Sequence, residues 1–246
     1  MPWNEIDANG PYTKIANWYP RSTNSNKRYN LCALGANQRL YCWAEESGYG
    51  SPYVANAVAN LTTTQFTDVG LGQSFGCGLD VDQKIICFGS NDLGQTNAPT
   101  DSQYAALSVG TCKSCAIDTE GKMSCWGYSG GGDENTYKVV STSHSGVCSS
   151  SYTWAIDTND ELAYWGVSNS PDTAGTYKDV ATGGADACAI TTAGAVKCWG
   201  MSEEPTGASN FDSIYVETGN GSSAQACALT TEGKLTCWGN IFIPAL

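Results

Sequence analysis

A hairpin with a cysteine at the outer end of each arm recurs along this 246-residue chain. Its last copy reads Cys227-Ala-Leu-Thr-Thr-Glu-Gly-Lys-Leu-Thr-Cys237-Trp-Gly. Two strand-like arms flank a three-residue turn that ends in Gly233, where such a turn needs a left-handed residue. Counting inward from both ends places Cys227 opposite Cys237, and directly opposed residues have Cβ atoms about 4.5–5.5 Å apart. That separation is close to what a disulfide requires, so the hairpin predicts a bridge across its own arms.

The same hairpin occurs six times, in residues 32–43, 77–89, 115–127, 154–166, 188–200 and 227–239. From Cys32 to Cys227 the chain advances 195 residues in five steps, a mean period of 39. An aromatic residue, followed three positions later by an aliphatic one, precedes each hairpin: Tyr12/Ile15, Phe66/Val69, Tyr104/Leu107, Tyr137/Val140, Tyr177/Val180 and Phe211/Ile214. Each unit therefore predicts one strand and then a two-stranded hairpin, which is the content of a β-propeller blade.

These units predict an all-β fold, a six-bladed β-propeller formed by residues 1–246 as one domain. Helical repeats have similar periods, but these segments lack a 3.6-residue periodicity and are rich in Gly, Thr, Val and Tyr. Six blades lie within the known range of about four to eight for a closed ring. We expect residues 2–9 and 240–246 to meet and complete one blade, because open sheet edges invite aggregation.

The cysteines fit a structural role. Five pairs share a ten-residue spacing and are predicted disulfides: Cys32–Cys42, Cys77–Cys87, Cys115–Cys125, Cys188–Cys198 and Cys227–Cys237. The fourth hairpin has Trp154 and Tyr164 at the corresponding positions, where a cross-strand aromatic pair can substitute. Zinc sites would place only two to four residues between paired cysteines.

Two cysteines, Cys112 and Cys148, remain outside the hairpins. Cys112-Lys-Ser-Cys115 has the spacing of a redox motif, but the hairpin register already pairs Cys115 with Cys125. We therefore predict a Cys112–Cys148 disulfide between neighbouring blades.

Composition and charge exclude several partners. The net charge is −12 and the sequence pI is about 4.3, so the surface repels nucleic acid and anionic membranes. No apolar run reaches the roughly 20 residues that a transmembrane helix needs. Twelve cysteines predict an oxidising compartment. Because the start of the chain lacks the features of a signal peptide, we expect a secreted protein in its mature form. Asn60 and Asn220 match the glycosylation acceptor pattern.

Nothing in the sequence points to catalysis. His144 is the only histidine, so a Ser-His-Asp triad would have to use it. No metal-ligand spacing or phosphate-binding loop is found, so we expect no metal and no cofactor. The acidic run after Gly130 lacks the alternating oxygen ligands of a calcium loop, and we interpret it as a solvated turn. Paired carboxylates for glycoside hydrolysis cannot be read from spacing. We expect a protein that is not an enzyme.

Binding residues are expected in the loops that do not repeat. The hairpin turns have constant length, whereas the loops before the hairpins vary from 8 to 17 residues and lie on the opposite face of the disc. Variable loops on a rigid scaffold commonly carry binding sites. The regions of interest are 16–31, 44–57, 141–153 and 215–226, and the candidate residues on this face are Trp18, Tyr19, Tyr49, Tyr53, Tyr128, His144 and Tyr152. The tryptophan of each Cys-Trp-Gly is instead interpreted as packing between blades.

The pattern Val-x-x-Gly…Cys-Ala-Leu-x-x-x-Gly-x-x-x-Cys-Trp-Gly resembles the repeats of the regulator-of-chromosome-condensation (RCC1) superfamily. Residues 90–97, Ser-Asn-Asp-Leu-Gly-Gln-Thr-Asn, are similar to that family's Asn-x-x-Gly-Gln-Leu-Gly segment. The paired cysteines resemble the extracellular branch with Crinkly4-type repeats. The resemblance covers about residues 12–239 and implies a propeller, although this chain has six units where seven is usual. Members include a nuclear exchange factor, receptor ectodomains and a β-lactamase inhibitor protein.

The sequence thus predicts a secreted recognition module that binds a protein partner through its variable-loop face. Two alternatives stay open: a lectin with sites in the long loops, and a structural subunit of an extracellular fibre or matrix. A lectin propeller with equivalent sites in successive blades would need matching loop residues, and we find no such set. The sequence does not determine the ligand or the oligomeric state.

Overall fold

The computed structural model describes residues 11–18, 30–44, 54, 58–129, 133–144, 148, 152–166, 171–201, 204–205, 210–218 and 224–239. Within these residues the strands form six antiparallel three-stranded sheets, here called blades 1 to 6 in chain order. Blades 1 to 3 consist of β1 (Tyr12–Trp18), β2 (Asn30–Gly35), β3 (Leu40–Ala44); β4 (Phe66–Leu71), β5 (Phe75–Asp80), β6 (Ile85–Gly89); and β7 (Tyr104–Val109), β8 (Lys113–Asp118), β9 (Met123–Gly127). Blades 4 to 6 consist of β10 (Tyr137–Thr142), β11 (Thr153–Asp157), β12 (Leu162–Trp165); β13 (Tyr177–Gly183), β14 (Asp186–Thr191), β15 (Val196–Trp199); and β16 (Phe211–Thr218), β17 (Ala224–Thr230), β18 (Leu235–Gly239).

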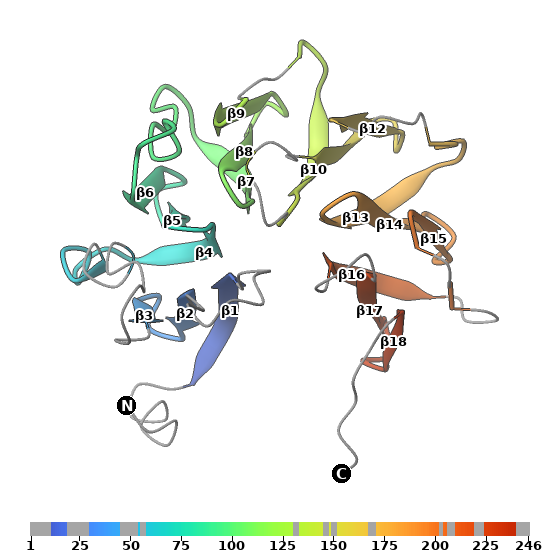
Figure 1. The fold of residues 1–246 in the computed structure, drawn as a ribbon, viewed down its shortest axis with the longest axis horizontal. Helices are drawn as coiled ribbons and strands as arrows, with labels where there is room; N and C mark the ends of the chain where they lie inside the picture. Colours follow the sequence, from blue (N-terminus) through green and yellow to red (C-terminus); the bar gives the residue numbers. More distant parts are fainter. Residues whose placement is uncertain are drawn as a thin grey trace.

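The blades follow one another around a common centre, with the first strand of each blade innermost (Figure 1). Each innermost strand contacts the innermost strand of the next blade, from β1 and β4 through to β13 and β16. Blade 1, which holds the first described strand, and blade 6, which holds the last, lie on the same side of the arrangement (Figure 1). The expected joint blade of residues 2–9 and 240–246 falls outside the described residues.

One backbone hydrogen bond joins each blade to the next. The third residue of every hairpin turn is left-handed, including the non-glycine residues Gln38, Gln83 and Asp160 at φ of 62°, 62° and 72°. Its carbonyl accepts a bond from the N–H of the aromatic residue that begins the next innermost strand. These bonds run from Phe66 to Gln38, Tyr104 to Gln83, Tyr137 to Gly121, Tyr177 to Asp160 and Phe211 to Gly194, at 2.7–3.0 Å. The five aromatic side chains are fully buried.

The core is divided among the gaps between consecutive blades. Each hydrophobic cluster combines residues from two neighbours, as where Phe75 and Cys77 of blade 2 meet Tyr104 and Trp126 of blade 3. The same arrangement occurs between blades 1 and 2, 3 and 4, 4 and 5, and 5 and 6. The tryptophan after the hairpin therefore packs between blades, as predicted.

The hairpin register is as expected. Cys227 pairs with Cys237, and the other ten-spaced cysteines pair in the same way, with Cα–Cα distances of 4.0–4.1 Å. In blade 4, Trp154 lies opposite Tyr164 with ring centroids 5.3 Å apart. Trp154 also stacks on Trp199 of blade 5 at 5.0 Å, so it contributes to an interface between blades.

All four of the expected loop regions include strand residues at one end or both, and the strands reach furthest into 16–31 and 215–226. β1 continues to Trp18, which pairs with Asn30, so the backbone of Trp18 belongs to a strand rather than a loop. β16 continues to Thr218, which pairs with Ala224. The aromatic–aliphatic pattern that marks each innermost strand ends before these residues, and for this reason it underestimated the strand length.

We expect Trp154→Ala to lower the free energy of unfolding by about 3–5 kcal/mol, because it removes a fully buried ring from two contacts. Tyr164→Ala removes a half-buried ring and should cost clearly less. Urea unfolding at constant m-value measures both changes. Equal losses would show that the stack on Trp199 adds nothing.

Blade 6 exposes a surface that its counterparts bury. Leu229 and Leu235 are 39% and 62% exposed, whereas the matching Leu34 and Leu40 of blade 1 are 3% and 8% exposed. On blade 1, Ile15 is 68% exposed, although the matching Val69 and Val180 are buried. Blades 1 and 6, the first and last described, thus keep exposed apolar side chains at positions that other blades bury.

We expect deletion of residues 240–246 to lower Tm by at least about 4 °C, because these residues are predicted to complete a blade and protect its open edge. Thermal unfolding followed by circular dichroism measures the shift. A variant that replaces the same residues by Gly and Ser should show the same loss, because it removes only the apolar side chains. An unchanged melting curve in both variants would contradict the expectation.

Candidate binding face

The face opposite the hairpin turns, here called the loop face, is formed by the segments between the first and second strands of each blade. In blades 2 and 3 these segments are short, and they close by backbone bonds from Gly72 to Phe75 and from Gly110 to Lys113, both 2.8 Å. In blade 4 the segment is longer, but Ser143 N–H still donates to Tyr152 O at 2.9 Å. The loop face is therefore built on tight strand ends.

Backbone bonds also tie neighbouring loops together. Gln73 N–H donates to Thr111 O at 3.0 Å, and Thr111 N–H donates to Ser143 O at 3.2 Å. A Cβ atom on Gly110 would lie 2.5 Å from Ser143 O, so the close approach of blades 3 and 4 requires glycine there. His144 Nε2 lies 3.1 Å from Leu71 O and extends this contact to blade 2. Blades 2, 3 and 4 thus share one continuous loop surface.

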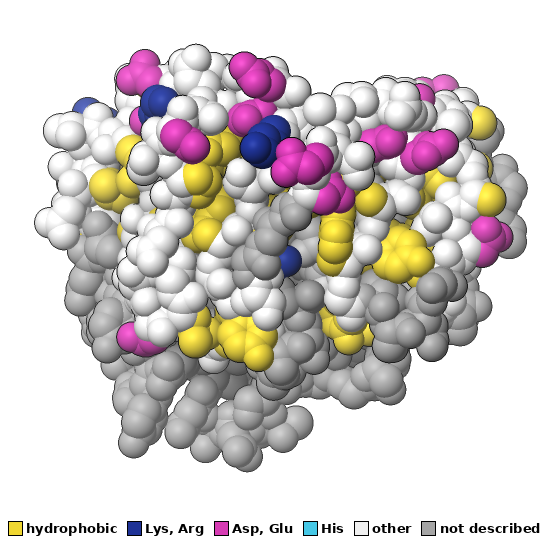
Figure 2. All heavy atoms as spheres, turned by 90° about the horizontal axis from the view of Figure 1, so that it is seen from above, with side chains coloured by type: hydrophobic (Ala, Val, Ile, Leu, Met, Phe, Trp, Pro, Cys, Tyr) yellow, Lys and Arg dark blue, Asp and Glu magenta, His cyan; other side chains and the backbone are white. Residues whose placement is uncertain are grey.

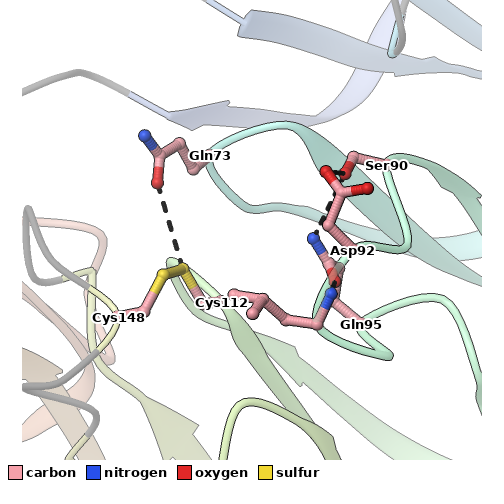
Figure 3. The surroundings of a disulfide bond; sticks show 7 residues. Gln73, Ser90, Asp92, Gln95, Cys112 and Cys148 are labelled. Atoms are coloured by element: carbon pink, nitrogen blue, oxygen red, sulfur yellow. Dashed lines mark hydrogen bonds between the residues drawn. A yellow bond between two sulfur atoms is a disulfide. The ribbon is translucent and has the colours of Figure 1, made fainter.

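A disulfide closes this surface. Cys112 of the blade 3 loop and Cys148 of the blade 4 loop form the predicted bridge between neighbouring blades, with Cα atoms 5.3 Å apart (Figure 3). Gln73 Oε1 of blade 2 lies 3.9 Å from Cys112 Sγ. A bridged sulfur has no proton to donate, so we regard this as a contact. Cys115 is bonded to Cys125 and not to Cys112, so Cys112-Lys-Ser-Cys115 does not form a redox disulfide.

Residues 90–97, which carry the family-like pattern, support blade 3 from the side. Gln95 is buried, and its Oε1 accepts the Leu93 N–H at 2.7 Å while its Nε2 lies 3.5 Å from Ser90 Oγ. Ser90 Oγ in turn donates to Asp92 Oδ2 at 2.8 Å (Figure 3). The Gln95 carbonyl accepts the Trp126 indole N–H at 3.0 Å. This segment therefore holds the inter-blade tryptophan in place.

Three of the candidate residues, Tyr128, His144 and Tyr152, lie in described segments of blades 3 and 4. Tyr128 is exposed, and its N–H donates to Cys112 O at 2.9 Å. His144 and Tyr152 are half-buried and lie on either side of the Cys148 loop. Trp18 has no described side chain, and Tyr19, Tyr49, Tyr53 and Asn220 lie outside the described residues. Asn60 is exposed before blade 2.

The carboxylates of the hairpin turns are engaged in building those turns. Asp80, Asp118 and Asp157 each accept two backbone N–H bonds within their own turn, at 2.8–2.9 Å. On the side shown in Figure 2, Asp and Glu side chains gather along one rim. Asp80, Asp118 and Asp157 therefore have a structural use in their turns.

Lys113 is a feature of the loop face that the sequence reading missed. It begins β8 next to Cys112 and is 7% exposed, and burial lowers the pKa of its ammonium. Alternation along β8 could have found it, because Lys113 shares a strand side with Cys115.

The described residues contain no group of three or more His, Cys, Asp or Glu that could hold a metal ion. Within the same part of the chain, no helix has the length and apolar character needed to cross a membrane.

Comparison with solved structures identifies the fold. The ectodomain of the receptor kinase CR4 from Physcomitrella patens superposes with a TM-score of 0.72 at 20% identity, covering 94% of this chain and 65% of that one. Prp20p from Saccharomyces cerevisiae, the yeast RCC1, gives 0.63 at 12% identity over 93% and 81%. The Aleuria aurantia lectin gives 0.51 at 10% identity over 93% and 91%.

No protein-family profile and no curated sequence matches the chain. The structural likenesses show that its fold is the propeller of RCC1-like proteins and Crinkly-type ectodomains, as its repeats predict. The chain spans about two thirds of the CR4 ectodomain, 65% of its length.

We expect the double variant Cys112→Ala/Cys148→Ala to lose up to about 4 kcal/mol of stability, because the bridge closes a long loop of 36 residues. The matched control, Cys227→Ala/Cys237→Ala, opens a 10-residue loop whose arms stay paired and should lose less. Chemical unfolding under non-reducing conditions compares the two. A larger loss in the control would contradict a special role for the inter-blade bridge.

Proposed function

We propose that this protein is a secreted, non-enzymatic recognition module whose loop face binds a protein partner. The observation that carries the proposal is the difference between the two faces. The turn face repeats the same turn and the same backbone bonds in each blade, whereas the loop face differs from blade to blade. A protein footprint needs one irregular surface with a few aromatic anchors.

The region around Tyr128, His144 and Tyr152 is the proposed centre of that footprint. It combines an exposed tyrosine with two half-buried rings on a surface fixed by the Cys112–Cys148 bridge. A fixed surface loses little conformational entropy on binding, which favours affinity. The six disulfides support an oxidising, extracellular setting.

Affinity capture from the source organism's extracellular material tests the proposal. For the partner captured, we expect Tyr128→Ala to weaken binding by about tenfold or more, since aromatic anchors commonly contribute over 1 kcal/mol. Val81→Ala is the control, because Val81 is similarly exposed but lies in a hairpin turn. Equal effects of the two variants would contradict a loop-face site.

The lectin alternative is favoured by the similarity to a fucoside-binding propeller. A glycan array separates the two functions, because strong sugar binding without protein capture would replace the proposed function. Size-exclusion chromatography tests the remaining alternative, a structural subunit, which predicts large assemblies of this chain alone.

A further inference from the structure

The loop that follows blade 2, residues 90–97, carries an exposed leucine on a backbone that its own polar side chains hold in place. Leu93 is 43% exposed. Asn91 Oδ1 accepts the Thr96 N–H at 3.0 Å, and the buried Gln95 accepts the Leu93 N–H with Oε1 at 2.7 Å. The polar groups therefore fix the shape of the loop, and its exposed apolar side chain is available to a partner.

This loop lies against the loop-face end of β9, the strand that leads into Tyr128. Trp126 Nε1 donates to Gln95 O at 3.0 Å, and a Cβ atom on Gly127 would lie 3.3 Å from Gln95 Cα. Because consecutive Cα atoms are about 3.8 Å apart, the Cα atoms of Leu93 and Tyr128 are at most about 16 Å apart. Tyr128 is 37% exposed. One partner covers about 800 Å², or roughly 30 Å across, so both side chains fall within a single footprint.

The same loop supplies a fixed negative charge beside the leucine. Asp92 is exposed, and its Oδ2 accepts the Ser90 hydroxyl at 2.8 Å (Figure 3). Within the described part of the chain, Asp92 makes no ion pair. Lys113 also lies beside Gly127 but is only 7% exposed, so Asp92 is the charge that this rim offers to a partner. The net charge of −12 adds a long-range attraction for cations.

We propose that Asp92, Leu93 and Tyr128, here called the rim patch, dock a segment of the protein partner in which Lys or Arg flanks an apolar side chain. Leu93 and Tyr128 contact the apolar side chain, and Asp92 pairs with the cation. The loop is already held in shape, so little conformational entropy is lost on docking. Both Asp92 and the net charge oppose an acidic segment. The rim patch rests on the proposed function, because it names the partner chemistry that the loop face recognises.

The test follows leucine methyl signals by NMR in protein labelled with 13C-methyl leucine, where Leu93→Met assigns the Leu93 signal. The probe is the peptide acetyl-Lys-Trp-Lys-amide, and acetyl-Glu-Trp-Glu-amide has the same ring with the opposite charge. We expect the cationic peptide to shift the Leu93 signal saturably and the anionic peptide to leave it unchanged. Leu235 is the internal control, because at 62% it is more exposed than Leu93 but lies on blade 6. The absence of a saturable shift, an equal shift at Leu235, or equal binding of the two peptides would overturn the rim patch.

Matched variants separate docking from a structural role, with affinity measured by anisotropy of the dye-labelled cationic peptide. Leu93→Ser should weaken binding at least fivefold and leave Tm unchanged, whereas Leu235→Ser should leave the affinity unchanged. Asp92→Asn should weaken binding about threefold, as expected for an exposed ion pair. A lowered Tm with unchanged affinity in Leu93→Ser would assign the leucine to stability and overturn the rim patch. Unchanged affinity in Asp92→Asn would overturn the pairing with a cation.

Failure of the rim patch and failure of the proposed function give different results. If a captured protein binds wild type, Leu93→Ser and Asp92→Asn equally, the loop face recognises its partner elsewhere and the rim patch is wrong. If the cationic peptide titrates Leu93 but no protein is captured, the rim patch holds its ligand chemistry and the protein-binding function fails.

Discussion

The bond on which the arrangement of the blades depends is a backbone one, from the first aromatic residue of each of blades 2 to 6 to the last turn residue of the blade before. It sets the position of each blade against its neighbour while the aromatic ring enters the shared core. Because donor and acceptor are both backbone groups, the bond does not depend on the side chain at the turn. It does require a left-handed residue there, which costs a non-glycine residue about 1–2 kcal/mol. Gln38, Gln83 and Asp160 are left-handed at this cost. The inter-blade hydrogen bond and the burial of the aromatic ring that follows offset the cost.

This constraint explains what could be predicted from the sequence. Turn, arm and aromatic residue recur at fixed spacing because the geometry between blades is the same each time. Counting inward from Cys227 and Cys237 was enough to find the register, and the tryptophan beside the bridge was correctly placed between blades. Features without a repeat were harder. The extension of β16 to Thr218 depends on its pairing with β17, beyond the end of the aromatic–aliphatic pattern. The burial of Lys113 could have been indicated only by alternation along β8.

The two faces use their polar groups differently. On the turn face, Asp80, Asp118 and Asp157 are satisfied by their own turns, and Thr191 and Thr230 accept the equivalent N–H with their hydroxyl in blades 5 and 6. These groups stabilise hairpins and have little capacity left for a ligand. On the loop face, backbone bonds hold the loops together. The side chain of Tyr128 stays exposed there, because its contact with the neighbouring loop is made by its backbone N–H. A surface that can vary without unfolding the blades is where recognition can be built.

Blade 4 shows which part of the hairpin bridge is dispensable. Trp154 and Tyr164 replace two cysteines with a ring contact, and the blade keeps the same strand pairing. The covalent bond is therefore one of two ways to fill and fix the same gap. The Cys112–Cys148 bridge has no such substitute, because the nearby contacts between blades 3 and 4 are made by Gly110, Thr111 and Ser143. Small residues allow the close approach but offer no apolar area to hold it, and a covalent link supplies what packing there cannot.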